Sequence, residues 1–290
     1  MRWQLWDAER VAAEARQHVA AERLDEIVTS VAPGWVLQDA DDADRTCVRV
    51  GGEPRMADDE PWPQNDDGLP LTFVAEVDLD SLPPIGADWA DPRPSVLRTG
   101  LLRLFADLGV EPYGSCGAAD LLLPDSGAAT RRPAPVWPAE APRNAGEDAV
   151  FALPETRATA RPFLTLPESL PGLNQPFPTD EAGESYRDLT YRIRVGQAQA
   201  WLKDLMRDGP NPWSLCHLFG HATSVQDDVR YSARHQHPEI ELSEWTTVLG
   251  LHSGWGGLEI FDGGAYWVLV PTGELTEGRW ERAVFDSASC

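Results

Sequence analysis

Apolar side chains recur at helical spacing near the start of the chain and again about two thirds of the way along it. In residues 7–31 these positions predict one long helix, which Asp7 can cap and Pro33-Gly34 ends. Residues 196–208 show a second amphipathic pattern that is followed by a Gly-Pro stop signal. We therefore expect two principal helices.

Strand patterns fill much of the remaining chain. From Leu71 to Leu79 most apolar and polar residues alternate with the period of two that is typical of a strand. Gly100 opens a second apolar segment that ends at Leu108, and we expect the two segments to pair as an antiparallel ribbon. Further short apolar runs predict strands at residues 35–37, 46–50, 148–153, 161–166, 245–251, 258–261, 265–270 and 280–285.

A strand, a loop and a strand led by glycine occur twice, in residues 71–108 and again in residues 247–275. Internal similarity of this kind indicates related structural units. We therefore expect an α+β fold: two pseudo-repeated halves of mostly antiparallel sheet with a few flanking helices in one continuous body. Residues 1–50 are expected to add an N-terminal helix and short strands to the α+β domain of residues 51–290, and to form one compact unit with it.

The charge balance limits the choice of partners. The 290 residues include 47 Asp and Glu but only 24 Lys and Arg, which gives a formal net charge of −23. Nucleic-acid backbones and anionic membrane surfaces attract clustered cations, so neither is expected as a partner. The acidic surplus favours a basic protein as partner, because opposite charge speeds encounter. The acidic surplus also fits a surface that is charged for solubility. The sequence leaves the oligomeric state open.

Targeting signals do not stand out in the chain. No run approaches the ~18 apolar residues of a membrane span, and the first ten residues lack the apolar stretch of a secretory signal. The four cysteines, Cys47, Cys116, Cys216 and Cys290, are spread without C-x-x-C spacing, as reduced thiols are. These features predict a cytoplasmic location.

Several short motifs follow one another in an order and spacing found in one bacterial family. They are Gly51-Gly52-Glu53-Pro54, Trp62-Pro63, Gly68-Leu69-Pro70-Leu71, Thr99-Gly100-Leu101-Leu102, His217-Leu218-Phe219-Gly220-His221, Gln226-Asp227-Asp228, Asp262-Gly263-Gly264 and Ser287-Ala288-Ser289-Cys290. Over residues 50–290 the chain thus resembles the YwqG-like family (DUF1963), whose function is unknown. The resemblance implies an α+β body of antiparallel sheet and no settled activity. Glu76 stands where the family usually has glutamine, which puts in doubt any ligand shared through that position.

His217 and His221 are the first candidates for chemistry. On a helix, H-x-x-x-H spacing would place both rings on one face, as zinc sites require. The glutamate of H-E-x-x-H is missing and Gly220 disfavours a regular helix, so we expect no bound metal. Cys216 beside His217 would be a poor pair of nucleophile and base, since adjacent residues point to opposite faces of a strand. Phosphate-loop and dinucleotide motifs do not occur in the sequence, so no cofactor is expected.

Two hypotheses about function remain. The one we favour is a non-enzymatic binding or interaction protein, in its sharper form an acidic inhibitor or immunity-type partner of a basic protein, with loop tryptophans at the contact surface. The alternative is a small-ligand-binding protein or enzyme with a pocket between the two halves. The candidate site residues are Trp62, Phe73, Glu76, His217, His221, Gln226 and Trp255. A cleft with converging polar side chains would favour the alternative. A flat acidic face rimmed by tryptophan would favour the first hypothesis.

Overall fold

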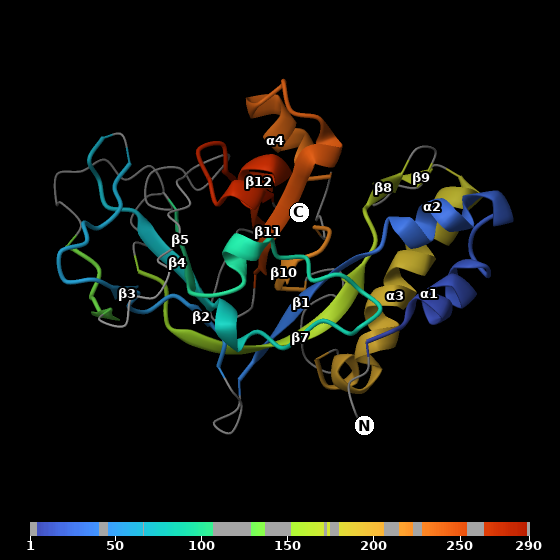
Figure 1. The fold of residues 1–290 in the computed structure, drawn as a ribbon, viewed down its shortest axis with the longest axis horizontal. Helices are drawn as coiled ribbons and strands as arrows, with labels where there is room; N and C mark the ends of the chain where they lie inside the picture. Colours follow the sequence, from blue (N-terminus) through green and yellow to red (C-terminus); the bar gives the residue numbers. More distant parts are fainter. Residues whose placement is uncertain are drawn as a thin grey trace.

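The computed structural model of the protein describes residues 5–40, 46–65, 67–106, 129–136, 152–170, 173–174, 180–205, 215–222, 228–253 and 264–288. Nine strands form the main sheet: β1 (Ala32–Asp39), β2 (Val48–Val50), β4 (Thr72–Asp78), β5 (Leu101–Ala106), β7 (Thr156–Thr165), β10 (His217–Phe219), β11 (Trp245–His252), β12 (Ala265–Pro271) and β13 (Val284–Ala288). The order in the sheet is β13-β12-β11-β10-β1-β7-β2-β4-β5, and each neighbouring pair is antiparallel (Figure 1).

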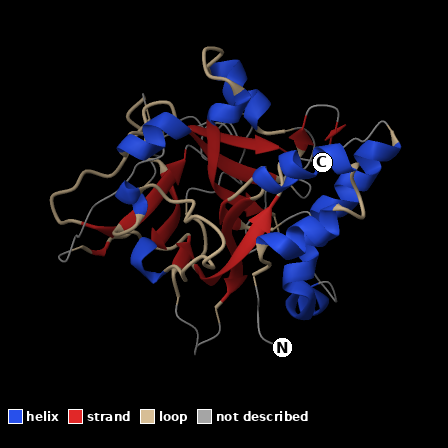
Figure 2. Ribbon diagram, turned by 45° about the vertical axis from the view of Figure 1, so that its right-hand side comes forward, coloured by secondary structure: helices blue, strands red, loops and turns tan. Residues whose placement is uncertain are grey.

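Helices and two short ribbons surround this sheet (Figure 2). The helices are α1 (Ala8–Ala15), α2 (Leu24–Thr29), α3 (Glu181–Leu205), α4 (Arg230–Gln236) and α5 (Thr272–Glu277), and the ribbons pair β3 (Arg55–Met56) with β6 (Thr130–Arg131) and β8 (Ser169–Leu170) with β9 (Leu173–Asn174). The predicted α+β class is confirmed. Within the described part of the chain, every helix is too short or too polar to cross a membrane.

The pairing of β1 with β7 forms the centre of the sheet. It covers eight residue pairs, from Ala32 opposite Thr165 to Asp39 opposite Ala158. β10 pairs with the other edge of β1, and β2 with the other edge of β7. Gly34 permits the close approach of β1 and β10, because a Cβ atom there would lie only 2.7 Å from two backbone carbonyl oxygens of β10.

The strands on the two sides of this central pair correspond to each other. β2, β4 and β5 follow β7 on one side, as β10, β11 and β12 follow β1 on the other. The pairing of β4 with β5 has a bulge at Val74, and that of β11 with β12 has one at Val248. This shared strand order and the matching bulges agree with the predicted repeat of two related halves. Because Val74 and Val248 are equivalent, the second copy begins at Trp245, two residues earlier than predicted.

Equivalent positions in the two halves carry different side chains. On β2 and β4, Arg49 lies opposite Glu76. Glu76 lies two residues after the bulge of β4, and Gly250 lies two residues after the bulge of β11. In the second half, His217 of β10 lies opposite Gly250. The backbone plan is therefore shared by the two halves, whereas the chemistry that it carries is not.

One hydrophobic core unites both halves. Its members from the sheet include Val50, Val77, Leu104, Leu218, Leu249 and Val268. Leu97, in a 3-10 helix of residues Ser95–Leu97, and Leu275 of α5 join the same cluster. Burial of this shared apolar surface stabilises one continuous body rather than two separable ones.

Smaller hydrophobic clusters attach the remaining elements to the sheet. α1, α2 and α3 lie together (Figure 1), with Val11, Ile27 and Tyr186 in one cluster that reaches β7. α4 packs over β12 and β13 around Trp267. The loop that precedes β4 covers β4 and β5, where the ring of Trp62 meets that of Phe105.

The single helix predicted over residues 7–31 is wrong. The chain forms α1, a 3-10 turn over Ala21–Arg23 and then α2, and α1 packs against α2. In a straight helix Val11 and Ile27 would lie about 24 Å apart. Folding the segment back brings both side chains into one cluster beside α3, so tertiary packing overrides the local helical pattern.

Other predicted boundaries also change. Pro33-Gly34 lies inside β1, since pairing with β7 outweighs the local stop signal. The helix predicted over residues 196–208 begins at Glu181, and the strand predicted over residues 280–285 begins only at Val284. The structure assigns residues 35–37, 46–50, 161–166, 245–251 and 265–270 largely to strands as predicted. The predicted strand at 258–261, and most of that at 148–153, lie outside the described residues.

We expect Gly34→Ala to destabilise the fold by about 1–3 kcal/mol, because the new methyl group would press on the backbone of β10. Gly273→Ala is the matched control: no atom lies within 4 Å of its Cβ position, and alanine favours the helix α5 in which it lies. Urea unfolding followed by circular dichroism measures both variants. Wild-type stability of Gly34→Ala would contradict the close approach of β1 and β10.

Candidate functional site

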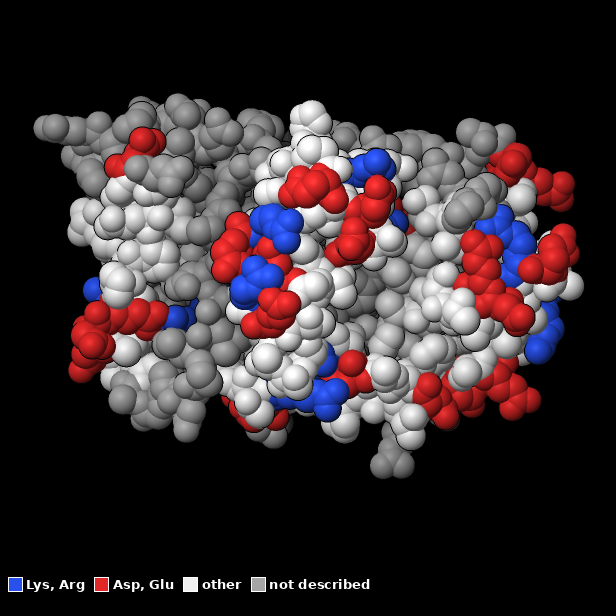
Figure 3. All heavy atoms as spheres, turned by 45° about the horizontal axis from the view of Figure 1, so that its top comes forward, with Lys and Arg blue, Asp and Glu red and all other residues white. Residues whose placement is uncertain are grey.

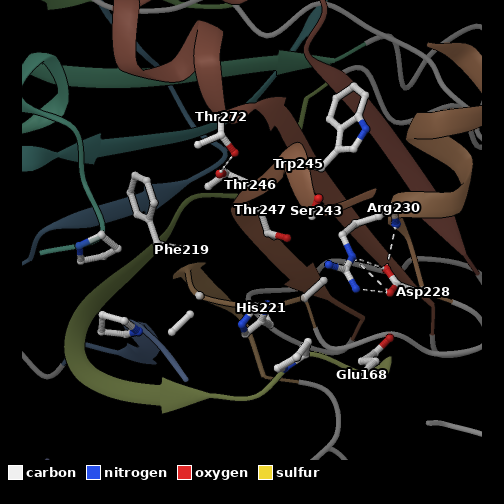
Figure 4. A pocket seen from close by; sticks show the side chains of 16 residues that line it. Glu168, Phe219, His221, Asp228, Arg230, Ser243, Trp245, Thr246, Thr247 and Thr272 are labelled. Atoms are coloured by element: carbon white, nitrogen blue, oxygen red, sulfur yellow. Dashed lines mark hydrogen bonds and ion pairs between the residues drawn. The ribbon is translucent and has the colours of Figure 1, made fainter. Parts of the chain in front are cut away.

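A cavity of about 240 Å³ lies where the ends of β1, β7, β10 and β11 meet (Figure 4). The polar residues that matter most in its lining are Glu168, His221, Asp228, Arg230, Ser243 and Thr247. They come from four separate parts of the chain. This strand-end cavity is smaller than the ~300–1,000 Å³ of pockets for drug-sized molecules.

The turn after β10 forms one wall of the strand-end cavity. Phe219 has φ +55° and Gly220 has φ +78°, whereas the equivalent turn after β2 uses two glycines. A bulky residue with positive φ is strained, and here the buried ring of Phe219 packs edge-on against Trp35. Glycine is required at position 220, because a Cβ atom would lie 2.8 Å from Oγ1 of Thr165. His221 directly follows this strained turn and lines the cavity.

His221 is held by both its backbone and its ring. Its backbone N–H donates to Oγ1 of Thr165 (2.8 Å), and its Nε2 donates to the carbonyl oxygen of Ser30 (2.8 Å). This bond places the proton on Nε2 and leaves the lone pair on Nδ1. Burial, with a smaller contribution from the charges of Arg230 and Arg194, lowers the pKa of His221 to about 4. The ring is therefore neutral at pH 7.

An ion pair forms the opposite wall. The Nε of Arg230 donates to both carboxylate oxygens of Asp228 (2.9 and 3.1 Å), and the hydroxyl of Ser169 donates to the same carboxylate (3.2 Å). Burial opposes ionisation of Asp228, but the hydrogen bonds and the charge of Arg230 hold its pKa below the ordinary value. Beside this pair lies the buried carboxylate of Glu168, which also interacts with the charge of Arg230. Arg230 and Ser169 thus occupy the carboxylate of Asp228, and Glu168 is the carboxylate of this wall that can accept hydrogen bonds from a ligand.

Hydroxyl groups and an indole complete the lining. The hydroxyl of Thr272 donates to the carbonyl oxygen of Glu244 (2.9 Å), so that of Thr246 donates to Thr272 (2.8 Å). Thr247 and Trp245, which begin β11, are buried against the cavity (Figure 4). The cavity therefore combines apolar residues, among them Phe219 and Trp245, with hydrogen-bonding groups from several elements.

His217 lies in the strand next to this site and is fully buried. Its Nδ1 donates to the carbonyl oxygen of Phe219 (2.9 Å), and burial lowers its pKa to about 4. Gly250 makes room for the ring, since a Cβ atom there would lie 2.6 Å from Nε2 of His217. His217 is in a strand and His221 in the following turn, so a helix does not place the two rings on one face.

The predicted aromatic residues belong to a different place. Trp62 and Phe73 are 7% and 3% exposed and share a hydrophobic cluster with Phe105. The indole N–H of Trp62 donates to the carbonyl oxygen of Leu71 (2.8 Å). This cluster contains neither His217 nor His221, so these four predicted residues do not assemble around one pocket among the described residues.

Of the other predicted residues, Glu76 is buried among arginines on the first half of the sheet. Gln226 and Trp255 lie outside the described residues. Sequence reasoning missed Glu168 and Thr247 entirely. It had a signal for Asp228, which closes the Gln-Asp-Asp motif, but no reason to connect that motif with the ends of four strands.

Cys216 does not form a reactive pair with His217. Its side chain belongs to the central core, where its sulfur accepts a hydrogen bond from the backbone N–H of His252 (3.2 Å). Burial raises the pKa of the Cys216 thiol to about 12, which keeps it protonated and a poor nucleophile. Across the described ranges, no three His, Cys, Asp or Glu side chains are grouped so that they could hold a metal ion.

A family model matches most of the chain. Residues 48–289 match a family model described as a domain of unknown function, DUF1963. A search of curated proteins finds no significant match to the chain. The family match begins only at residue 48, whereas β1, from the segment before it, lies at the centre of the sheet.

We expect stability to fall as the pH drops from about 6.5 towards 4. Over this range the unfolded chain protonates its histidines while folded His217 and His221 stay neutral, so acid favours the unfolded state. Each of these two histidines lowers the free energy of unfolding by on the order of 1–2 kcal/mol between pH 7 and pH 5. His221→Asn keeps a donor for Ser30 but does not titrate, and urea unfolding should show a smaller loss.

His235→Asn, which changes an exposed histidine, should behave as the wild type in the same comparison. An acid-induced loss that is identical in His221→Asn and the wild type would contradict the burial of a neutral His221.

Proposed function

The chain belongs to the DUF1963 family, for which no function is described, and from the geometry of the strand-end cavity we propose that it binds a small polar ligand there. The observation that carries the proposal is the convergence of a neutral histidine, a carboxylate and several hydroxyls on one cavity of about 240 Å³. Small-molecule sites are concave and combine apolar walls with a few placed polar groups. The ligand lies between the neutral ring of His221 and the Asp228–Arg230 pair.

The lining indicates a ligand that mainly donates hydrogen bonds. Nδ1 of His221 accepts, as does the carboxylate of Glu168, and the hydroxyls of Ser243 and Thr247 can do either. The indole of Trp245 supplies apolar contact. A small molecule with several hydroxyl or amino groups on a compact carbon frame fits this pattern.

The same groups favour binding over catalysis. A general base works best when its pKa lies near the working pH, and the pKa of His221 is about 4. The buried thiol of Cys216, with its pKa of about 12, is not activated. We therefore propose a non-enzymatic role, carried out in the cytoplasm, where the free thiols of Cys47 and Cys216 stay reduced.

A second candidate function is an interaction with a basic protein, which the net charge of −23 supports. Asp and Glu side chains are distributed over the face seen in Figure 3, with arginines between them. Salt would slow such an association, because the Debye length falls to about 8 Å at physiological ionic strength. The buried indole of Trp62 has no part in this candidate, since it packs in the protein interior.

We expect at least one member of a panel of small polyols, sugars, amines and amino acids to raise the melting temperature of the protein. A ligand at a hundred times its Kd adds about 2.7 kcal/mol of stability, which thermal-shift measurements detect. Thr247→Val removes a hydroxyl from the cavity wall at nearly constant shape and should reduce the shift.

Thr276→Val, which alters an exposed threonine of α5 outside the lining, is the matched control and should leave the shift unchanged. The proposal fails if no compound stabilises the wild type, or if Thr247→Val and Thr276→Val respond alike to the compound that does.

A further inference from the structure

A second concave site lies on the first half of the sheet, apart from the strand-end cavity. It is a hollow of about 330 Å³ lined by nine described residues, four of which are arginines. This arginine hollow gathers Arg49 of β2, Arg55 of β3, Arg131 of β6 and Arg157 of β7. Its volume lies within the range of pockets for small molecules.

Two carboxylates hold the arginines in place. Glu76 accepts from Arg49 (2.9 Å) and from Nε of Arg55 (2.6 Å), and its second oxygen accepts the backbone N–H of Arg55 (2.9 Å). Glu155 accepts from Arg131 (2.9 Å) and from Nε of Arg157 (3.1 Å). Each carboxylate thus orients two guanidinium groups around the hollow.

The hollow keeps a positive surplus in a strongly acidic protein. Beside its four arginines the lining holds two carboxylates, Glu76 and Asp78. Among the described residues, the four arginines still outnumber the carboxylates when Glu155 is counted as well. Burial is the main cause that lowers the pKa of Arg49, and the neighbouring charges of Arg131 and Arg55 add to it. An additional negative charge at this place would therefore be stabilised.

The fold does not itself need charged groups here. In the second half, His217 occupies the position equivalent to Arg49, and Gly250 occupies the position equivalent to Glu76. His217 and the neighbouring Trp267 are fully buried there. In the second half, the rings of His217 and Trp267 fill this place. In the first half, the same place is an open hollow lined with guanidinium groups.

We propose that the arginine hollow binds the phosphate group of a small molecule. A phosphate offers several strong acceptor oxygens and up to two negative charges, and guanidinium groups bind such oxygens through paired N–H donors. The side chains of Arg157 and Arg131 are 60% and 46% exposed, and both form ion pairs with Glu155. They are the arginines nearest to solvent, where the ligand enters, and Arg49 and Arg55 form the deeper wall.

Titration calorimetry with inorganic phosphate tests this site, with sodium chloride at matched ionic strength as reference. The wild type should bind phosphate saturably, and Arg157→Gln should weaken binding about fivefold or more, as expected for loss of a charge-assisted hydrogen bond. Arg192→Gln removes an arginine of similar exposure (57%) elsewhere on the surface and should leave binding unchanged. Urea unfolding checks that both variants are folded.

Asp78→Asn gives the opposite expectation. It removes a negative charge from the lining but keeps an oxygen that can accept from the backbone N–H of Ser81, so phosphate should bind more tightly. Thr247→Val, in the strand-end cavity, should have no effect, which separates this proposal from the proposed function.

Glycerol phosphate and succinate distinguish the ligand class. Binding of glycerol phosphate in preference to succinate supports a phosphate site, whereas equal binding of the dicarboxylate overturns that assignment. Absence of saturable phosphate binding to the wild type overturns the proposal, and so does an Arg157→Gln variant that binds as the wild type does.

Discussion

The antiparallel pairing of β1 with β7 is the constraint on which the rest of the structure depends. The two strands lie more than a hundred residues apart in the sequence, and they pair over eight residues. Each then provides the edge on which one half of the sheet is built, through β10 and β2. Because the strand-end cavity lies at the ends of β1, β7, β10 and β11, the same pairing sets its shape. Long-range pairing of this kind costs loop-closure entropy before its contacts form.

From this centre the two halves follow one plan and carry different chemistry. The bulges at Val74 and Val248 fix the equivalence of their strands. In the first half the plan positions arginines around a hollow, and in the second it positions a strained turn and a neutral histidine at a cavity. A shared backbone with divergent sites is the usual relation between fold and function. The two sites also differ in the charge of the ligand they suit.

Local pattern predicted the sheet better than the helices or the sites. The alternation in residues 71–79 predicts β4, although both faces of that strand are buried: Phe73 packs in a cluster with Trp62, whereas Ala75 and Val77 enter the central core. The internal repeat follows from the same signal. The N-terminal helix was predicted too long, because only packing against α3 shows that its two halves must fold back. Trp62, between two prolines, resembled a surface platform, but its indole N–H is satisfied by Leu71 within a buried cluster.

The sites could not be assembled from the sequence for a related reason. Glu168, Asp228 and Thr247 acquire a common cavity only through strand order. The short pairing of β3 with β6 likewise brings Arg131 beside Arg55, from a stretch that the Pro-rich sequence marks only as a loop. Family resemblance placed Glu76 at a position of interest, and the structure surrounds it with arginines.

Native-state hydrogen exchange tests the central claim most directly. If both halves depend on the β1–β7 pair, the amides of residues 32–39 and 156–165 should exchange only through global unfolding, with the same free energy as urea unfolding measures. The β4–β5 and β11–β12 pairs should be no more protected than this centre. Strong protection that persists in either outer pair after β1 and β7 have exchanged would contradict the account.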